Sequence, residues 1–295
     1  MEISKLFKEK KIVYSFEIFP PKLNSPIEVI YDTLSHLENL KHDYLSVTYG
    51  AGGSDVKSRT CDIASIIKNK YNIEPLSHLT CINSKKDEVR QVLDALRDGN
   101  VTNILAMRGD KQPGTIVADD FKFSYHLMDF IARNGGFNIA GACYPEGHPE
   151  CESLTKDIEY MKKKQDCGAE FFITQMFFDN GLFYEFINKA RKTGVTAPVQ
   201  VGIMPITSTK QIERIVYLSG ARIPQKLSKL LARYGSNKEA MTQAGIIYAT
   251  EQIMDLVENN VQGIHIYTMN NLNIARRITE NINSVISMEN TSYLG

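Results

Sequence analysis

The sequence that decides the fold reads NIAGACY at 138–144, LTKDIEYMKKK at 154–164 and EFFITQMFF at 170–178. The first and third segments are short apolar runs, which are typical of buried strands. The middle segment has the apolar spacing of a helix. This strand–helix–strand order predicts parallel strands that are joined by a right-handed crossover.

The same alternation extends along the whole chain, and a longer helical stretch from Leu227 to Val257 precedes the last strand. About eight strand–helix units in roughly 250 residues predict a closed (β/α)8 barrel, or TIM barrel, of the α/β class. An open doubly wound sheet is the alternative, but no GxGxxG follows the first strand and no GxxxxGK(S/T) occurs. We therefore expect one catalytic domain over residues 1–295, with extra helices before the eighth strand. The predicted strands are 12–19, 44–49, 76–82, 103–107, 138–144, 170–178, 199–204 and 263–269.

The composition argues against several classes of protein. Lys+Arg and Asp+Glu both number 34, so the formal net charge is zero, which argues against nucleic-acid and membrane-surface binding. Hydrophobic residues make up 43% and charged residues 23%, which excludes a disordered chain. The sequence shows no secretory signal and no apolar run long enough to span a bilayer. The five cysteines form no CxxC pair and no metal-ligand spacing occurs, so we expect no metal site and a cytoplasmic location.

Polar side chains gather where the predicted strands end. Functional groups of such barrels lie on the rim formed by the C-terminal ends of the strands, so these side chains predict one ligand site. The predicted strand beginnings carry no comparable collection. The rim residues are Glu17, Thr48 to Ser54, His78 with Thr80, Arg108 to Asp110, Tyr144 to His148, Thr174 with Gln175, and Tyr267 to Asn270.

Each of these residues also has a purely structural interpretation. Glu17 is either a solvated rim salt bridge or a proton donor, and its apolar and aromatic neighbours favour the donor, because burial favours the protonated form of a carboxyl group. His78 is either a core histidine or a catalyst, and Arg108 and Asp110 either pair with each other or contact a ligand.

The helix after the fifth predicted strand can also be interpreted in two ways. Asp157, Tyr160 and Lys164 are spaced i, i+3 and i+7, so they share one face of that helix. The face is either a solvated surface or a nucleotide-binding surface, with the carboxylate on ribose hydroxyls and the lysine on phosphate.

Six segments, taken in order, resemble the methylenetetrahydrofolate reductase family, and the resemblance runs from about residue 12 to 282. The chain resembles the short bacterial form, because the regulatory C-terminal extension of eukaryotic members is missing. The segments are FEIFPPK (16–22), SVTYGAGGS (46–54), HLTC (78–81), RGD (108–110), YPEGHPE (144–150) and ITQMFFD (173–179).

The resemblance implies a (β/α)8 barrel that holds FAD without a Rossmann motif. It implies that NAD(P)H reduces the FAD and that the reduced flavin then converts 5,10-methylenetetrahydrofolate to 5-methyltetrahydrofolate in a ping-pong reaction. No 2′-phosphate clamp is visible that would separate NADH from NADPH, and NADH is expected by analogy with bacterial members. A homo-oligomer is expected on the same ground.

The resemblance also assigns roles to individual residues. Glu17 matches the glutamate that protonates folate N10, and Asp110 matches the aspartate near flavin and pterin. Gln175 and Gln211 match the folate-binding glutamines. The FAD-binding positions carried over are Thr48, Tyr49, Ala51, His78, Arg108, Gly109, Asp110, Tyr144, His148, Asp157 and Lys164.

The sequence departs from the family at three positions that bear on substrate packing. Ile215 replaces a phenylalanine that stacks on substrates in some members, Asn271 replaces an arginine near the folate tail, and Tyr160 replaces a common amide.

Three other functions are compatible with parts of the sequence. A proline-dehydrogenase-like flavin barrel would not need the acid in FEIFPP, and a Schiff-base aldolase would need a lysine such as Lys22 or Lys111. A flavin- or folate-binding carrier would bind without turnover.

Overall fold

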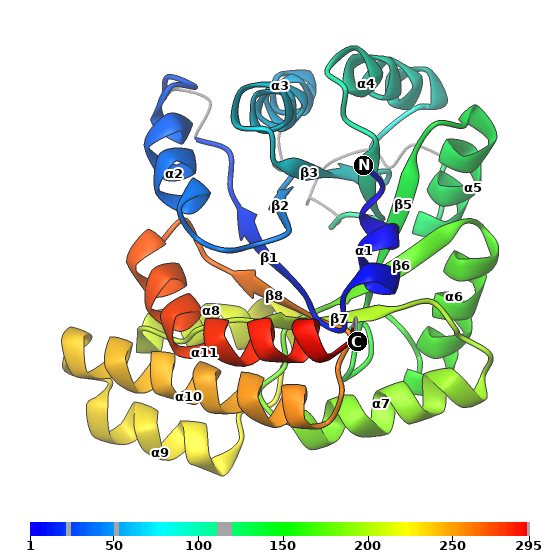
Figure 1. The fold of residues 1–295 in the computed structure, drawn as a ribbon. Helices are drawn as coiled ribbons and strands as arrows, with labels where there is room; N and C mark the ends of the chain where they lie inside the picture. The colour runs from blue at the N-terminus through cyan, green and yellow to red at the C-terminus, as the bar shows by residue number, and fades with distance from the viewer. Residues whose placement is uncertain (22–24, 50–52, 111–119, 294–295) are drawn as a thin grey trace.

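Eight parallel strands form a closed barrel in the order β1 to β8, with helices around the outside (Figure 1). The structure is a computed structural model, and it describes residues 1–21, 25–49, 53–110 and 120–293. The predicted (β/α)8 fold and the extra helices before the eighth strand are therefore confirmed.

The strands and helices alternate along the chain as the sequence predicts. The strands are β1 (Val13–Ile18), β2 (Tyr44–Val47), β3 (Glu74–Thr80), β4 (Asn103–Met107), β5 (Asn138–Cys143), β6 (Ala169–Thr174), β7 (Val199–Ile203) and β8 (Gly263–Tyr267). The helices are α1 (Ile3–Glu9), α2 (Val29–Glu38), α3 (Gly53–Tyr71), α4 (Lys86–Asp98), α5 (Ser124–Asn134), α6 (Leu154–Asp166), α7 (Asn180–Lys192), α8 (Thr209–Ser219), α9 (Gln225–Tyr234), α10 (Lys238–Glu258) and α11 (Leu272–Tyr293).

Alternate residues of each strand point to opposite faces, so the barrel has two separate cores. The larger core lies between the strands and the surrounding helices. The smaller one fills the N-terminal end of the barrel interior with residues such as Val13, Leu76 and Phe171. The middle of the interior is polar, which leaves chemistry-bearing side chains between the apolar plug and the C-terminal rim.

Helix α1 closes the N-terminal end of the barrel, and the sequence analysis did not predict it. Ile3, Leu6 and Phe7 are buried in the interior core. Polar residues at strand beginnings bond to α1, since Asn103 accepts from the Ile3 amide at 2.9 Å and Asn138 from the Ser4 amide at 3.1 Å. The expectation that strand beginnings carry no polar collection was therefore wrong, and the reason is that they bind this helix.

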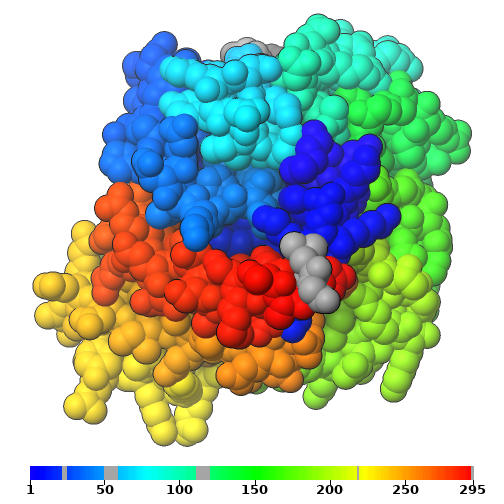
Figure 2. All heavy atoms as spheres, in the orientation of Figure 1, coloured from blue at the N-terminus to red at the C-terminus, as the bar shows by residue number. Residues whose placement is uncertain are grey.

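The segment that precedes β1 lies against the end of α11. Figure 2 shows the first residues in dark blue beside α11 in red. The Ile12 amide donates to Asn290 Oδ1 at 2.8 Å, and Lys11 pairs with Glu289. These contacts attach α1 and β1 to the final helix of the barrel.

The added helices α8 to α10 surround a third apolar cluster next to the rim. It includes Ile212, Ile215 and Leu227. Gly245 of α10 lies against the loop that follows β7, where an added Cβ would come within 1.7 Å of the Ile206 carbonyl oxygen. This close approach holds the α8 end of the rim in place.

Candidate active site

Glu17 extends from β1 into the barrel between two histidines. Its side chain is buried, and its Oε2 lies 3.6 Å from His78 Nε2 on β3 and 3.7 Å from His265 Nε2 on β8. The carboxyl group thus lies inside the barrel, whereas the alternative from sequence was a solvated pair on the rim.

His78 is neutral in this environment. Its Nε2 lies 2.5 Å from Ser46 Oγ on β2. Burial lowers the pKa of His78 to about 4, and the nearby Glu17 only partly opposes this effect. Near neutral pH the ring therefore adds hydrogen-bonding capacity to the Glu17 environment without adding charge.

His265 belongs to the same cluster and was not predicted from the sequence. Its side chain is fully buried, its Nδ1 lies 2.7 Å from Ser15 Oγ, and its Nε2 is buried without a hydrogen-bond partner in the described part of the chain. The signal was available in GIHIY (263–267), where strand alternation places His265 and Tyr267 on one face.

The loop after β8 holds the end of β1. Thr268 Oγ1 donates to the Glu17 carbonyl oxygen at 2.7 Å. Asn270 accepts from the Phe19 amide at 2.8 Å and donates to the Phe19 carbonyl at 2.9 Å. These bonds fix the main chain on both sides of the Glu17 side chain.

A first cavity of about 330 Å³ opens at the ends of β4 and β5, which is within the usual size range of ligand pockets. It unites five of the residues that the resemblance selected, and those residues come from two strand ends and one helix. The five are Arg108, Tyr144, His148, Asp157 and Lys164.

Two oppositely charged side chains of this cavity, Lys164 and Asp157, are buried. Lys164 Nζ donates to the Ala142 carbonyl at 2.7 Å, and Asp157 Oδ2 accepts from the His148 amide at 3.1 Å. Burial lowers the pKa of Lys164 and raises that of Asp157, while the attraction between them opposes both shifts. Arg108 pairs with Glu150 at 2.8 Å, whereas the sequence had suggested Asp110 as its partner.

Three stacked aromatic rings are associated with this cavity, and two of them were not predicted. Phe123 lies 5.5 Å from Tyr160 and 5.3 Å from Tyr125 between ring centroids, and all three residues line the cavity. Tyr160, the departure from the family amide, is thus part of an aromatic platform. The run FKFSY (121–125) could have indicated them, because its three aromatic residues alternate with polar ones.

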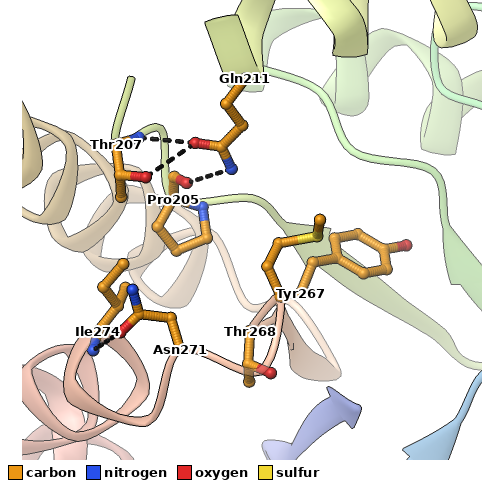
Figure 3. Close-up of a pocket in the computed structure, with 8 residues that line it drawn as sticks. Pro205, Thr207, Gln211, Tyr267, Thr268, Asn271 and Ile274 are labelled. Carbon is orange, nitrogen blue, oxygen red and sulfur yellow. Dashed lines mark hydrogen bonds between the residues drawn. The ribbon is translucent and has the colours of Figure 1, made fainter. Parts of the chain in front are cut away.

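A second cavity of about 240 Å³ lies beside β8 on the same rim (Figure 3). Gln211, Asn271 and Tyr267 line it. Gln211 accepts from the Thr207 amide at 2.8 Å and donates to the Pro205 carbonyl at 3.1 Å, so its amide group is held at the cavity wall.

Tyr267 reaches across the mouth of the barrel. Its hydroxyl donates to the Thr174 carbonyl at 2.6 Å, directly before Gln175. Gly202 leaves room for the ring, since an added Cβ would lie 2.6 Å from the Tyr267 hydroxyl oxygen. The tyrosine therefore links the predicted folate residue Gln175 to the second cavity.

The remaining predicted residues lie at the same rim or outside the described residues. Asp110 is exposed, and its charge adds to the burial that raises the pKa of Tyr144. Gly109 has a φ of +84°, and an added Cβ would lie 3.0 Å from Thr80 Cβ.

The predicted residues after β2 lie beside β1 and the outer core. The Thr48 amide donates to the Ile18 carbonyl at 3.0 Å, and the Tyr49 ring packs against the outer core. Ala51 lies outside the described residues, as do Lys22 and Lys111.

The two other departures from the family occupy different environments. Ile215 is buried in the cluster beneath α8. Asn271 lines the second cavity, and its Oδ1 accepts from the Ile274 amide at 3.3 Å. Only Asn271 is placed to contact a ligand directly.

Fold and site together define a (β/α)8-barrel protein with a ligand site on its C-terminal rim. A family model described as methylenetetrahydrofolate reductase matches residues 2–283. The chain belongs to the methylenetetrahydrofolate reductase family.

Two relatives illustrate the extent of the similarity. The 5,10-methylenetetrahydrofolate reductase of Pectobacterium carotovorum is 30% identical over 273 residues, which cover 91% of this chain and 89% of the relative. Methylenetetrahydrofolate reductase (NADH) 1 of Arabidopsis thaliana is 32% identical over 284 residues, covering 91% of this chain and 48% of the relative. The chain thus spans about half the length of the plant relatives it matches.

A solved structure shares the fold. An uncharacterized protein from Clostridium thermocellum, which binds two copies of 5-methyl-5,6,7,8-tetrahydrofolic acid, superposes with a TM-score of 0.65 at 15% identity. The match covers 98% of this chain and 100% of that one. Separately, in the described ranges we find no helix that combines the length and apolar character needed to cross a bilayer.

Proposed function

We propose that this protein reduces 5,10-methylenetetrahydrofolate to 5-methyltetrahydrofolate, with FAD as cofactor and NADH as reductant. The observation that carries the proposal is the match to the Pectobacterium reductase, because it extends over 89% of that relative. The plant relatives named for NADH support the choice of reductant. Glu17 is a buried carboxyl group inside the barrel, and Thr268, which donates to the Glu17 carbonyl oxygen, lines the second cavity. Glu17 is thus available as the acid that the reaction requires.

The first cavity fits the nucleotide part of FAD. An ammonium group has three donors, and the described hydrogen bond of Lys164 uses one of them, on Ala142. A buried cation with unused donors is suited to an anionic phosphate. Arg108 and Lys164 would hold the pyrophosphate, Asp157 the ribose or ribityl hydroxyls, and Tyr144 would pack on a ring of the cofactor.

Bound FAD would supply hydride transfer between NADH and the folate. The protein must supply a proton, because the five-membered ring of the folate opens only when N10 is protonated. Glu17 donates that proton, and ring opening leaves the N5 iminium that accepts the hydride. Asp110 is exposed at the rim, and it would stabilise the positive charge of the iminium once the bound ligands exclude water from it.

The second cavity holds the folate. Gln211 presents an amide to it, and Gln175 lies beside the carbonyl that Tyr267 binds. We assign both glutamines to the pterin and its linker. Gln175 would also contact the nicotinamide if the two substrates bind at the same place in turn.

Absorption spectroscopy under anaerobic conditions tests the proposal. The purified protein is expected to show the yellow flavin band, to bleach with NADH, and to recover its colour with methylenetetrahydrofolate. Parallel runs with NADPH measure the preference for the reductant.

The alternative functions predict different outcomes of the same experiment. A carrier would bind flavin or folate but would not bleach and recover. A proline-dehydrogenase-like enzyme would bleach with proline and fail to recover with the folate. Borohydride trapping of a covalent substrate adduct would indicate an aldolase. Any of these results would reject the proposed reduction.

A further inference from the structure

A chain of hydrogen bonds in the barrel interior leads toward Glu17. It runs from Tyr44 through Gln200 and Ser15 to His265. Gln200 of β7 is fully buried, and its Nε2 lies 2.9 Å from the Ile264 carbonyl oxygen and 3.2 Å from that of Val13. Carbonyl oxygens only accept hydrogen bonds, so the side-chain atom of Gln200 that faces them must be the amide nitrogen. Its Oε1 accordingly accepts from the Tyr44 hydroxyl at 2.6 Å.

This orientation of Gln200 leaves the single hydroxyl proton of Ser15 free to be donated. Gln200 Nε2 donates to Ser15 Oγ at 2.8 Å, so the serine oxygen is an acceptor there. The serine hydroxyl proton remains available for His265 Nδ1, which lies 2.7 Å away. A neutral imidazole that accepts at Nδ1 carries its proton on Nε2.

We propose that His265 is a positioning residue for Glu17, because Ser15 and Gln200 hold its imidazole with the Nε2–H directed at the Glu17 carboxyl group. The two atoms are 3.7 Å apart, and His265 Nε2 is buried without another partner in the described residues. The inference rests on the proposed function, in which Glu17 gives its proton to folate N10.

The Nε2–H of His265 acts after Glu17 has given up its proton. Proton transfer breaks the carboxyl O–H bond and forms N10–H, which leaves a buried carboxylate at Glu17. The carboxylate attracts the Nε2–H, and the contact shortens into a charge-assisted hydrogen bond, since catalytic bonds often tighten only when substrate is present. His265 thereby stabilises the product of the proton transfer.

The other titratable groups around Glu17 stay uncharged. His78 faces it from β3, and burial lowers the pKa of His78 to about 4. Tyr44 on β2 and Tyr267 on β8 also face it, and burial raises the pKa of both hydroxyls. His78 Nε2 already has Ser46 Oγ as a partner, whereas His265 Nε2 has no other hydrogen-bond partner in the described residues. His265 is therefore the imidazole that is placed to donate to the Glu17 carboxyl group.

Nuclear magnetic resonance of histidine-labelled protein tests the tautomer without reference to activity. Long-range ¹H–¹⁵N spectra distinguish Nε2–H from Nδ1–H imidazole, and His265→Gln identifies the signal. We expect His265 to be in the Nε2–H form in the wild type. In Ser15→Ala we expect it no longer to prefer that form. An Nδ1–H tautomer in the wild type would overturn the proposal.

Stopped-flow measurement of the two half-reactions tests the role. His265→Leu should slow oxidation of the reduced flavin by the folate about 10- to 100-fold, the effect of one hydrogen bond to a charged group, and leave reduction by NADH unchanged. His265→Gln, which keeps an N–H donor, should recover most of the rate.

Three results separate the possible failures. Equal slowing of both half-reactions in His265→Leu, or no recovery in His265→Gln, would overturn the positioning role. His42→Leu, which removes a histidine from the loop before β2, is the control for loss of a ring. A wild-type protein that reduces no methylenetetrahydrofolate would instead refute the proposed function, and the catalytic role with it.

Discussion

Glu17 carries the proposed proton transfer, and its neighbours show how a barrel interior prepares a carboxyl group for it. Two imidazoles lie within 3.7 Å of the same oxygen. Both rings come from strands, whose main chains are held by the barrel hydrogen bonds. The geometry around the acid is therefore set by the most rigid part of the molecule.

Replacing Glu17 by glutamine should separate the two half-reactions. The amide cannot donate the proton to N10, and a general acid typically contributes about 10²- to 10⁴-fold. We expect the folate half-reaction to slow by that factor, while flavin reduction by NADH keeps its rate because it needs no such proton. Stopped-flow absorbance measures both steps, and equal slowing of the two would contradict the assignment.

Replacing Lys164 by methionine should weaken FAD binding. The variant keeps the volume of the side chain but loses the buried ammonium of the first cavity. Loss of one charged hydrogen bond should raise the Kd for FAD about 10- to 100-fold, as measured by fluorescence quenching of the flavin. Lys162→Met on the same helix is the matched control, because Lys162 pairs with Asp166 instead. Equal weakening in both variants would place the phosphates elsewhere.

At the scale of elements, the N-terminal end of the barrel contributes to stability and the C-terminal end forms the candidate site. Helix α1 closes one end with apolar side chains, and the loops after β4, β5, β7 and β8 build the two cavities at the other. Because the ends are far apart along the strands, stability and catalysis are expected to respond to different substitutions.

Phe7→Ala in α1 should lower stability without changing catalysis. The ring is buried and lies 5.2 Å from the Phe171 ring between centroids, so its removal leaves a cavity. We expect a loss of about 3 kcal/mol in the free energy of unfolding, measured in urea, with unchanged half-reaction rates. Lys8→Ala on the exposed side of the same helix is the control. A loss of flavin binding in folded Phe7→Ala would contradict this division between the two ends.

At the scale of the whole molecule, His78 links folding to pH. Its pKa falls to about 4 in the folded state, from about 6.5 in the unfolded chain. Between these values the unfolded chain binds the proton and the folded protein does not. The contribution is therefore complete above about pH 6.5 and is lost as the pH falls toward 4.

Chemical denaturation at pH 7 and pH 5 should reveal this linkage. We expect the wild type to lose about 2 kcal/mol more stability than His78→Gln between these two pH values. His36→Gln, on a partly exposed side chain of α2, should behave like the wild type. Identical losses in the wild type and His78→Gln would show that His78 is not the linked group.

The sequence by itself determined the class of fold and most of the candidate site. Strand and helix periodicity depend on neighbouring residues, so the eight units could be recognised locally, and residues at strand ends such as Arg108 and Tyr144 were expected on one rim. The helix α1 was missed, although Ile3, Leu6 and Phe7 have helical spacing.

Only the tertiary structure decided which side chains meet inside the barrel. His265 and Glu17 lie near opposite ends of the chain, and they become neighbours because β8 pairs with β1 when the barrel closes. The stacking of Phe123 on Tyr160 likewise depends on how α5 and α6 pack side by side. Such contacts follow from the register and tilt of a closed sheet, and no local pattern of residues specifies those quantities.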